Sequence, residues 1–519
     1  MDIKNNSVNN QNIEITPEFK TLYNEIVKNP DKNFFITGQA GTGKTTFLKW
    51  FRNKLSGKKN IAVVAPTGLA AINVQGETIH KFFKINLAVK DDAYMETLSF
   101  RINRFQSYEQ LKNNLKHLDI LIIDEISMVR ADTFKTIEYI LENNNIQIIL
   151  FGDICQLPPI VAEIKNDTIL KDLSMSEKEI FFSLYKNKYH KTDFETKFFF
   201  SYYKNENGYK NFYDKFNIRT LTKNFRQTND KTYLNILNKL RHGTDNITTA
   251  DIDILNKRVV IDKTKINSLY TVVTPQKIVA TNINNKRLNE IQMPFKLYKA
   301  TYEELTKVKK IKDYDNKNFV LEADDTETDF DWQLKPKNIE KMKPSERKEK
   351  IENYFQAPIE LLLKEGAKVM ILKNGKDNKY VNGSIGIVSG LYDDKIDVTL
   401  QNNKIVSVEK EVWEKIGYKY NKSTRKIESI TVAQYKQFPL MLAWAMTIHK
   451  SQGQTFSNLF VDLGNGIFEN GQLYVALSRI KNIDGLYLSR KIKLSDIKTD
   501  KFICNLDKDF MENKIKIKY

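Results

Sequence analysis

The sequence GQAGTGKT, from Gly38 to Thr45, lies between an apolar run and a helical pattern. The run from Asn33 to Thr37 reads as a buried strand, and the residues from Thr46 to Trp50 continue as a helix. A strand, a G-x-x-x-x-G-K-[ST] loop and a helix in this order allow backbone N–H groups to curl around phosphates at a helix N-terminus. The stretch therefore predicts an α/β domain that binds a nucleoside triphosphate.

Two side chains of this loop have predicted contacts with the ligand. Lys44 would reach the β- and γ-phosphates of ATP, and the hydroxyl of Thr45 would hold Mg²⁺. A glycine-rich turn with a chance lysine is the alternative, and the acidic motif described next argues against it. The predicted cofactors are ATP and Mg²⁺, and the predicted nucleotide-binding residues are Gly38, Gly41, Thr42, Gly43, Lys44, Thr45 and Thr46.

An apolar strand ends in two acids, Asp124 and Glu125, in the sequence LIIDE. Buried strands carry such charges only where the charges are paired or have a chemical role. We expect Asp124 to join Thr45 as a metal ligand, and Glu125 to polarise a water for attack on the γ-phosphorus. The tandem pair indicates a hydrolase rather than a kinase-like transferase, whereas the alternative is an exposed strand end.

Three further polar residues are candidates for contact with the γ-phosphate. Gln156, in FGDICQLPP, can bond the γ-phosphate or the attacking water. Arg226, in NFRQ, and Arg479, in ALSR, can neutralise charge in the transition state. Both arginines lie outside the first α/β unit, so they would reach the nucleotide from another domain. A surface salt bridge is the alternative explanation for each arginine.

Apolar runs along the chain predict two α/β units. The first group suits a parallel sheet that is covered on both faces, and the second group, far along the chain, suggests a second unit with an insertion. The runs of the first group are 34–37, 61–65, 120–123 and 146–151, and those of the second are 268–274, 458–462 and 486–489.

The insertion is expected over residues 301–429. It begins with a charged stretch at 335–350, which reads as a solvated helix or linker. Short strand patterns separated by turn signals follow, and they predict a small β-barrel. A separate segment, 181–216, contains 14 aromatic residues among its 36 and is predicted to pack between domains. A strip of rings that stacks bases is the alternative for that segment.

Composition favours a polyanionic partner. The 519 residues include 82 Lys plus Arg and 64 Asp plus Glu, a net charge of 82 − 64 = +18. Nucleic acid is the leading candidate, although genomic base bias can also produce a lysine-rich chain. With only Cys155 and Cys504 and five histidines, a disulfide scaffold and a Cys-rich zinc module are excluded. No apolar run reaches the roughly 18 residues of a membrane span, so we expect no membrane partner.

The motifs together resemble those of a known family. In chain order they are GQAGTGKTT, APTGLAA followed by TIH, DEIS with MV, GDICQLPP, LTKNFRQ, the VNG within 380–383, AMTIHKSQG and YVALSR. This order is similar to that of the PIF (petite integration frequency) DNA helicases, in the PIF/RecD/Dda-like branch, superfamily 1B. The resemblance extends from about Ile15 to Leu488, and the compact spacing after Asp124 is of the bacterial type.

The resemblance implies roles for particular residues. It assigns ATP hydrolysis to Lys44, Asp124, Glu125, Gln156, Arg226 and Arg479, in agreement with the chemical argument. It also implies contacts with single-stranded DNA from two domains: Pro66, Thr67, Gly68 and His80 on the first, and Thr447, His449 and Lys450 on the second.

The resemblance further implies two RecA-like motor domains with inserted accessory domains. Domain 1A is expected at 1–84 and 117–220, and domain 1B, the candidate wedge, at 85–116. Domain 2A is expected at 221–300 and 430–519, and domain 2B, a charged linker with an SH3-like barrel, at 301–429.

The implied activity is ATP-dependent 5′-to-3′ unwinding of DNA, in replication, repair, recombination or telomere maintenance. Single-stranded DNA and its junctions with duplex are the implied partners, and a monomer is the expected working form. The expected location is cytoplasmic and nucleoid-associated in a bacterium, and nuclear or mitochondrial in a eukaryote. The alternatives are a P-loop ATPase that remodels protein complexes, with DNA binding incidental, and a DNA-binding protein without catalysis.

One position departs from the family pattern. Family members usually carry an adenine-reading glutamine ahead of the phosphate-binding loop, whereas here Glu18 is followed by Phe19. Phe19 could stack near the adenine, or Gln11 or Gln39 could replace the missing glutamine. The sequence does not distinguish these alternatives.

Overall fold

The computed structural model describes most of the chain. The described residues are 14–85, 98, 102, 108–159, 197–203, 209–260, 270–309, 330–336, 348–355, 357–373, 375, 380, 383–421, 424, 426–464 and 466–512. No helix among them is long and apolar enough to cross a membrane.

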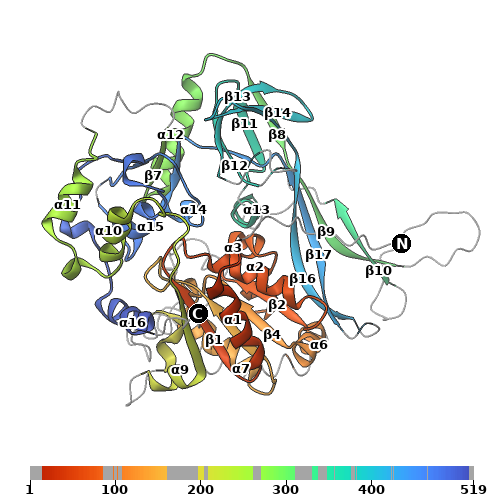
Figure 1. The fold of residues 1–519 in the computed structure, drawn as a ribbon. Coiled ribbons are helices and arrows are strands. Elements are labelled where there is room, and N and C mark those ends of the chain that lie inside the picture. The colour runs from red at the N-terminus through yellow and green to blue at the C-terminus, as the bar shows by residue number, and fades with distance from the viewer. Residues whose placement is uncertain are drawn as a thin grey trace, which may run out of the picture.

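The first α/β unit is built on a six-stranded parallel sheet (Figure 1). Helices α1 (Pro17–Lys28) and α2 (Lys44–Leu55) contribute to the apolar core on one face, and α7 (Ala131–Leu141) contributes to the core on the other. The four strands predicted from apolar runs are confirmed. In sheet order the strands are β3 (Glu77–Thr78), β2 (Ile61–Ala65), β4 (Ile120–Ile123), β5 (Gln147–Phe151), β1 (Asn33–Gly38) and β6 (Phe216–Leu221).

The second α/β unit has a four-stranded parallel sheet assembled from distant segments. The apolar core of this unit also includes side chains of α10 (Lys231–Arg241) and α15 (Gln472–Leu477). Since β7 comes long before the other three strands, an insertion divides this unit, as predicted. The strands, in sheet order, are β19 (Ala445–Thr447), β7 (Thr271–Thr274), β20 (Leu459–Val461) and β21 (Leu486–Leu488).

The insertion contains an antiparallel five-stranded sheet. Four of its strands match the predicted strand patterns, whereas the fifth, at 440–442, was not predicted. The buried side chains of the sheet share one apolar core with those of the pair β8 (Phe295–Lys299) and β11 (Glu360–Lys364). In sheet order the strands are β15 (Ile405–Glu409), β14 (Lys395–Leu400), β13 (Ile385–Leu391), β12 (Lys368–Ile371) and β18 (Leu440–Leu442).

A long hairpin connects the insertion to the first unit. Strands β16 (Glu411–Asn421) and β17 (Lys426–Gln437) pair along their whole length, and β9 (Thr301–Lys309) and β10 (Phe330–Pro336) extend the sheet. Near the far end, the hydroxyl of Tyr418 accepts a hydrogen bond of 3.0 Å from the backbone N–H of Val63 in β2. The expected boundary at 429 and 430 falls inside β17, because the strand pairing continues through it, so the insertion extends to Leu442.

Two other expectations fall partly outside the described residues. For the candidate wedge at 85–116, the structure describes Ile85, Leu98, Ile102 and residues 108–116, the last mostly in helix α6 (Glu109–His117). For the charged stretch at 335–350, it describes the end of β10 and the start of helix α13 (Lys348–Phe355).

The described part of the aromatic segment forms packing contacts. Phe199, Phe200 and Phe212 are buried in the core of the first unit. The C-terminal helix α16 (Lys501–Glu512) packs on the same core, where the rings of Phe510 and Phe35 have centroids 5.5 Å apart. These buried rings attach the C-terminal helix to the first sheet and are inaccessible to bases.

Candidate nucleotide site and nucleic-acid interface

The phosphate loop, residues 38–45, joins β1 to α2 with backbone geometry that requires glycine. Gly41 and Gly43 have φ angles of +88° and +81°. Gly43 caps α2 without a side-chain hydrogen bond, so the N–H groups of the first helical turn face the loop. The ammonium group of Lys44 donates to the carbonyl oxygens of Gly38 at 2.7 Å and Gln39 at 3.0 Å. The loop thus has the geometry of an anion site, with its lysine folded into it.

A cavity of about 800 Å³ opens at this loop. Side chains from both α/β units line it, and ten predicted site residues are among them. They are Gly41, Thr42, Gly43, Lys44, Thr45, Thr46, Glu125, Gln156, Arg226 and Arg479. The cavity therefore brings together residues as far apart in the sequence as Gly41 and Arg479, which are separated by 479 − 41 = 438 positions.

The acidic pair lies at the end of β4. Asp124 is buried, and both its burial and the charge of Glu125 raise the pKa of Asp124 to about 7. Burial likewise raises the pKa of Glu125, whose backbone is left-handed with φ +50°. The carboxylates of Asp124, which is buried, and of Glu125, which lines the cavity together with Thr45, are oxygen donors of the kind that suits Mg²⁺.

The two candidate arginines approach the cavity from the second unit. Arg226 donates to the carbonyl oxygen of Ser478 at 3.1 Å, and Arg479 donates to that of Val475 at 2.9 Å. Burial, followed by the charge of Arg226, lowers the pKa of Arg479 to about 9. Neither arginine forms an ion pair with a carboxylate in the described part of the chain, so the salt-bridge interpretation is wrong there. Two neighbouring cations, a buried one at Arg479 and a partly exposed one at Arg226, suit a polyanionic ligand.

Gln156 connects the acidic pair with the second unit. Its side-chain amide donates to Asp153 at 3.1 Å, and its carbonyl oxygen accepts from Gln452 at 3.2 Å. Gln452 also donates to Glu125 at 3.4 Å. Gln452 lies in the motif IHKSQG, but the sequence alone did not predict that this residue belongs to the site.

Three more contacts to the phosphate loop were missed. The N–H of Ala40 donates to the hydroxyl of Tyr474 at 3.0 Å. The side chain of Asn224 donates to the carbonyl oxygen of Ala40 at 3.0 Å, and the N–H of Phe225 donates to that of Gly41 at 2.9 Å. Asn224 and Phe225 belong to the motif LTKNFRQ and Tyr474 to YVALSR, but only the fold brings them to the loop.

Phe19 lies beside the phosphate loop and lines the same cavity. Its ring packs against Phe47, with centroids 5.2 Å apart, and against Phe225, with centroids 6.4 Å apart. A Cβ atom at Gly43 would stand 3.2 Å from both Phe19 and Phe225. Gln39 contributes backbone carbonyl contacts to the loop, and Gln11 lies outside the described residues.

The predicted DNA contacts lie at short helices of the two α/β units. Thr67 caps α3 (Gly68–Asn73) through a 3.2 Å bond to the N–H of Ala70. Thr447 caps α14 (Ile448–Ser451) in the same way, at 3.3 Å to the N–H of Lys450. Pro66 directly precedes the α3 cap, and His80 lies on α4 (Ile79–Phe82) in the same unit. Each motor unit thus presents one set.

Helix α13 lies between these two sets (Figure 1). Its Tyr354 contacts Gly68, where an added Cβ would stand 2.6 Å from the ring. On the other side, the charge of Glu352 acts on Lys450, whose pKa is lowered by burial and by Lys277. Burial also lowers the pKa of His449. The two sets are therefore close together, with part of the insertion covering them.

The comparisons with known proteins agree with this architecture. The model of the PIF1-like helicase family matches residues 12–189. The ATP-dependent DNA helicase Pif1 of Campylobacter jejuni is 28% identical over 473 residues, covering 89% of this chain and 90% of that protein. The protein of the same name from Bdellovibrio bacteriovorus is 26% identical over 487 residues, covering 92% and 88%.

Solved structures extend the likeness to the three-dimensional fold. Bacteroides sp Pif1 in complex with ADP-AlF4 superposes with a TM-score of 0.71 at 28% identity, over 96% of this chain and 97% of that one. Its unliganded structure gives the same score of 0.71. The structure of Bacteroides Pif1 bound to ssDNA gives 0.55 over the same coverage. By motif order, by sequence similarity along most of its length and by fold, the chain is similar to the PIF1-like helicases.

Proposed function

We propose that this protein is an ATP-dependent DNA helicase that moves 5′ to 3′ along single-stranded DNA and separates duplex or other structured DNA. The observation that carries the proposal is the cavity shared by the two motor units. Lys44 and Glu125 enter it from the first unit, and Arg226 and Arg479 enter it from the second. Hydrolysis of ATP in such a cavity changes the contacts through which the bound nucleotide joins the two units.

The site residues suit hydrolysis of ATP. Lys44 and the N–H groups of the loop hold the phosphates, and Gln156 and Glu125 orient and deprotonate the attacking water. Thr45 and Asp124 would hold Mg²⁺, which would supply positive charge to the phosphates. Arg226 and Arg479, which have no carboxylate partner within the described residues, neutralise the charge that develops on the transferred group. Phe19 and Phe225 form the apolar border where the base would lie.

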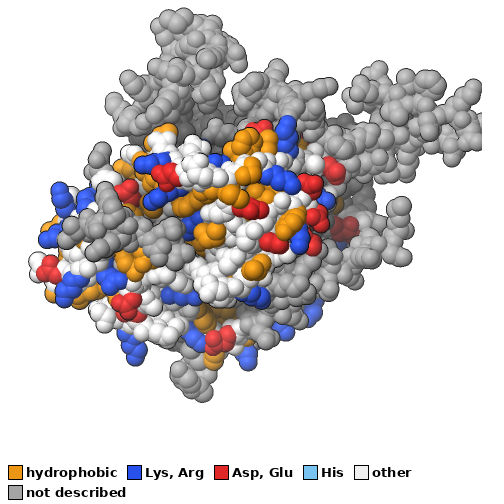
Figure 2. Space-filling model, turned by 90° about the horizontal axis from the view of Figure 1, so that it is seen from above, with side chains coloured by type: hydrophobic (Ala, Val, Ile, Leu, Met, Phe, Trp, Pro, Cys, Tyr) orange, Lys and Arg blue, Asp and Glu red, His pale blue; other side chains and the backbone are white. Residues whose placement is uncertain are grey.

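The DNA contacts are proposed at the two capped helices, α3 on the first unit and α14 on the second. Short polar side chains and backbone N–H groups there suit sugar and phosphate, which carry no sequence information. Among the described residues on the face seen from above, lysine and arginine side chains are scattered between acidic and apolar ones and do not form a single patch (Figure 2). ATP-driven closure would move the set on α14 toward the set on α3, one step per cycle.

Binding of DNA requires a change in the insertion. Helix α13 covers Gly68 in this structure, and the superposition is better with unliganded Bacteroides Pif1 than with that protein bound to ssDNA. We infer that the insertion, with its SH3-like sheet, rotates away as the strand enters. The region 85–116 is the proposed wedge, and the working form is proposed to be a monomer.

A strand-displacement assay tests activity and polarity together. Duplexes with a single-stranded tail at the 5′ or the 3′ end are mixed with the protein, ATP and Mg²⁺. The proposal predicts displacement of the 5′-tailed substrate only, and none by Lys44→Ala. Displacement of only the 3′-tailed substrate would overturn the polarity, and ATP hydrolysis that is unaffected by single-stranded DNA would overturn the proposed function.

A further inference from the structure

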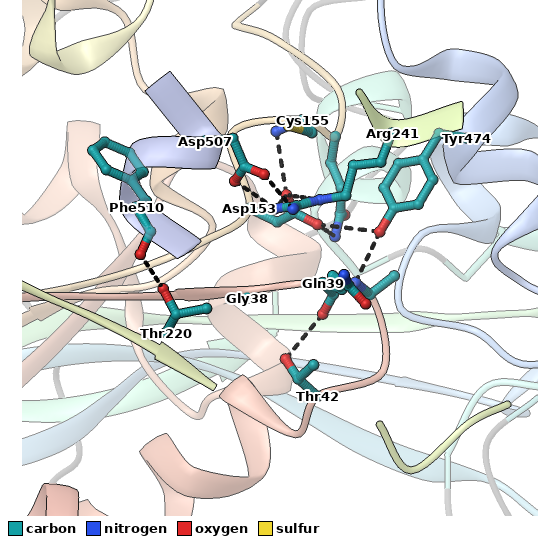
Figure 3. Close-up of polar contacts among 12 residues, drawn as sticks. Gly38, Gln39, Thr42, Asp153, Cys155, Thr220, Arg241, Tyr474, Asp507 and Phe510 are labelled. Atoms are coloured by element: carbon teal, nitrogen blue, oxygen red, sulfur yellow. Dashed lines mark hydrogen bonds and ion pairs between the residues drawn. The ribbon is translucent and has the colours of Figure 1, made fainter. Parts of the chain in front are cut away.

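A buried cluster of charged groups lies behind the phosphate loop (Figure 3). Asp153, Cys155 and Asp507 place ligand atoms within 4.8 Å of one another, a spacing that would suit a metal ion. The guanidinium group of Arg241 lies among them, and its side chain is fully buried, as are those of Asp153 and Asp507. The cluster is therefore an ion-pair centre that already contains its cation.

Arg241 makes forked contacts to both carboxylates. Its Nη2 donates to Asp153 at 2.8 Å and to Asp507 at 2.7 Å. Its Nε donates to Asp153 at 3.3 Å, and its Nη1 donates to Asp507. His242 Nε2 lies 2.8 Å from Oδ2 of Asp507, the oxygen that also accepts from Nη1 of Arg241. A planar fork held at this many points is fixed in orientation, which lysine could not reproduce.

The three charged residues come from different parts of the fold. Asp153 follows β5 of the first sheet, whereas Arg241 ends α10 of the second unit. Asp507 belongs to α16, which is attached to the first sheet by the bond of 2.7 Å from Thr220 to the carbonyl oxygen of Phe510. A side chain of the second unit is thus held between two carboxylates on the first.

The other oxygen of Asp153 leads to the nucleotide cavity. It accepts from the amide of Gln156 at 3.1 Å and from the hydroxyl of Tyr474 at 3.5 Å. That hydroxyl in turn accepts from the N–H of Ala40 in the phosphate loop. Asp153 therefore sets the position of the Gln156 amide, which lies at the predicted γ-phosphate position, and of the Tyr474 hydroxyl, which bonds the loop at Ala40.

Electrostatics keep the centre charged. Burial alone would raise the pKa of Asp153, but the charges of Arg241 and Lys44 outweigh it and keep that pKa below its usual range. Burial would lower the pKa of Arg241, yet Asp153 and Asp507 raise it well above its usual range. The centre therefore holds a cation between two anions. Loss of either carboxylate changes the strength of the ion pair between Arg241 and the remaining carboxylate.

We propose that Arg241 is a positioning residue for ATP hydrolysis, held in place by Asp507 of the C-terminal helix. It fixes Asp153, and Asp153 fixes Gln156 and Tyr474 against the nucleotide. This inference rests on the proposed function, because it assigns these residues to that reaction. Through Asp507, helix α16 then contributes to catalysis, although none of its described side chains lines the nucleotide cavity.

The test measures turnover per nucleotide-binding site in Asp507→Asn, which keeps the shape of the side chain and removes its charge. Titration with a fluorescent ADP analogue counts the competent sites and gives their Kd. We expect turnover per site, with saturating single-stranded DNA, to fall about tenfold or more, with Kd changed less than about threefold. Asp509→Asn, an exposed position on the same helix, is the matched control and should turn over as the wild type does.

A double-mutant cycle distinguishes positioning from a merely structural role. If Asp507 acts through Asp153 and Tyr474, Asp507→Asn and Tyr474→Phe together should lower turnover per site little more than either change alone. Multiplicative losses, or wild-type turnover per site in Asp507→Asn, would overturn the inference.

Tyr474→Phe keeps the ion pairs, so it remains informative if Asp507→Asn does not fold. Wild-type turnover per site in Tyr474→Phe would then overturn the inference. If the wild type itself hydrolyses no ATP in the presence of DNA, the proposed function fails first and the inference fails with it. An active wild type with an insensitive variant removes the inference alone.

Discussion

Tyr354 of helix α13 lies directly against Gly68, so that a Cβ atom at Gly68 would stand 2.6 Å from Cδ2 of the tyrosine. Gly68 begins α3, where one of the two predicted sets of DNA contacts lies. On the same helix, Phe355 stacks on Tyr435 of β17, with ring centroids 4.8 Å apart and planes 6° apart. The helix therefore joins the insertion to the surface that single-stranded DNA is proposed to occupy.

Weakening this contact should make DNA binding easier. Tyr354→Ala removes the ring that covers Gly68, so the insertion moves away at a smaller cost, and the Kd for single-stranded DNA should fall about three- to tenfold. Fluorescence anisotropy with a labelled oligonucleotide, in the absence of nucleotide, measures this change. Tyr392→Ala, at a half-exposed tyrosine of the five-stranded sheet, is the control. Weaker binding by Tyr354→Ala would show that the tyrosine belongs to the DNA site itself.

Glu125→Gln should separate binding of ATP from its hydrolysis. The amide keeps the shape of the buried carboxylate but cannot accept the proton of the attacking water, so turnover should fall by about 10²- to 10⁴-fold. The Kd for ATP should change by less than about threefold. Phosphate release and nucleotide titration measure the two quantities, with the exposed Glu142→Gln as control. Turnover at the wild-type rate would exclude Glu125 as the base.

Lys450 should contribute a phosphate contact that depends on salt. Replacing it with Met is expected to weaken binding of single-stranded DNA similarly for all sequences. The slope of log K against log salt should become shallower by about 1. Binding isotherms from about 50 to 200 mM salt give this slope, and Lys436→Met on the exposed side of β17 is the control. An unchanged slope would remove Lys450 from the DNA path.

Lys368 should make the stability of the protein depend on pH. It is fully buried in the core of the five-stranded sheet, and burial lowers its pKa from 10.5 to about 7. Between these values the unfolded chain binds more protons than the folded one, so stability rises with pH, by up to about 1.4 kcal/mol per unit.

Lys368→Met removes this dependence and avoids the cost of burying the amine. We expect the variant to raise the free energy of unfolding by roughly 2–4 kcal/mol at pH 7.5. Denaturant titrations from pH 7 to 9 compare it with the wild type and with Lys404→Met, an exposed turn position. A variant less stable than the wild type at pH 7.5 would contradict the account.

The sequence was informative wherever a residue pattern has a local physical cause. Strands β1, β2, β4 and β5 could be predicted because buried parallel strands are continuously apolar. The two residues of β3, Glu77–Thr78, give no such pattern. The hairpin of β16 and β17 carries charged side chains along both strands and lacks a continuous apolar run, and the expected boundary between residues 429 and 430 falls inside β17.

The candidate site was predictable to a similar degree. Lys44, Glu125 and Gln156 follow strands of one sheet, and the carboxyl ends of parallel strands meet at one edge. Tyr474 and Arg241 could not be found in this way, because their partners lie 434 and 88 positions away in the chain. Only the docking of the second unit on the first creates those contacts.

The most direct test of the shared cavity is the ATP turnover of Arg479→Ala in saturating single-stranded DNA. Arg479 belongs to the second unit and, among the described residues, donates its side-chain hydrogen bonds to Val475 and Ser478 rather than to the phosphate loop, yet it lines the same cavity. The account predicts a fall in turnover of about 10³-fold or more, with ATP still bound. Turnover at the wild-type rate would show that the first unit hydrolyses ATP alone and would contradict the account.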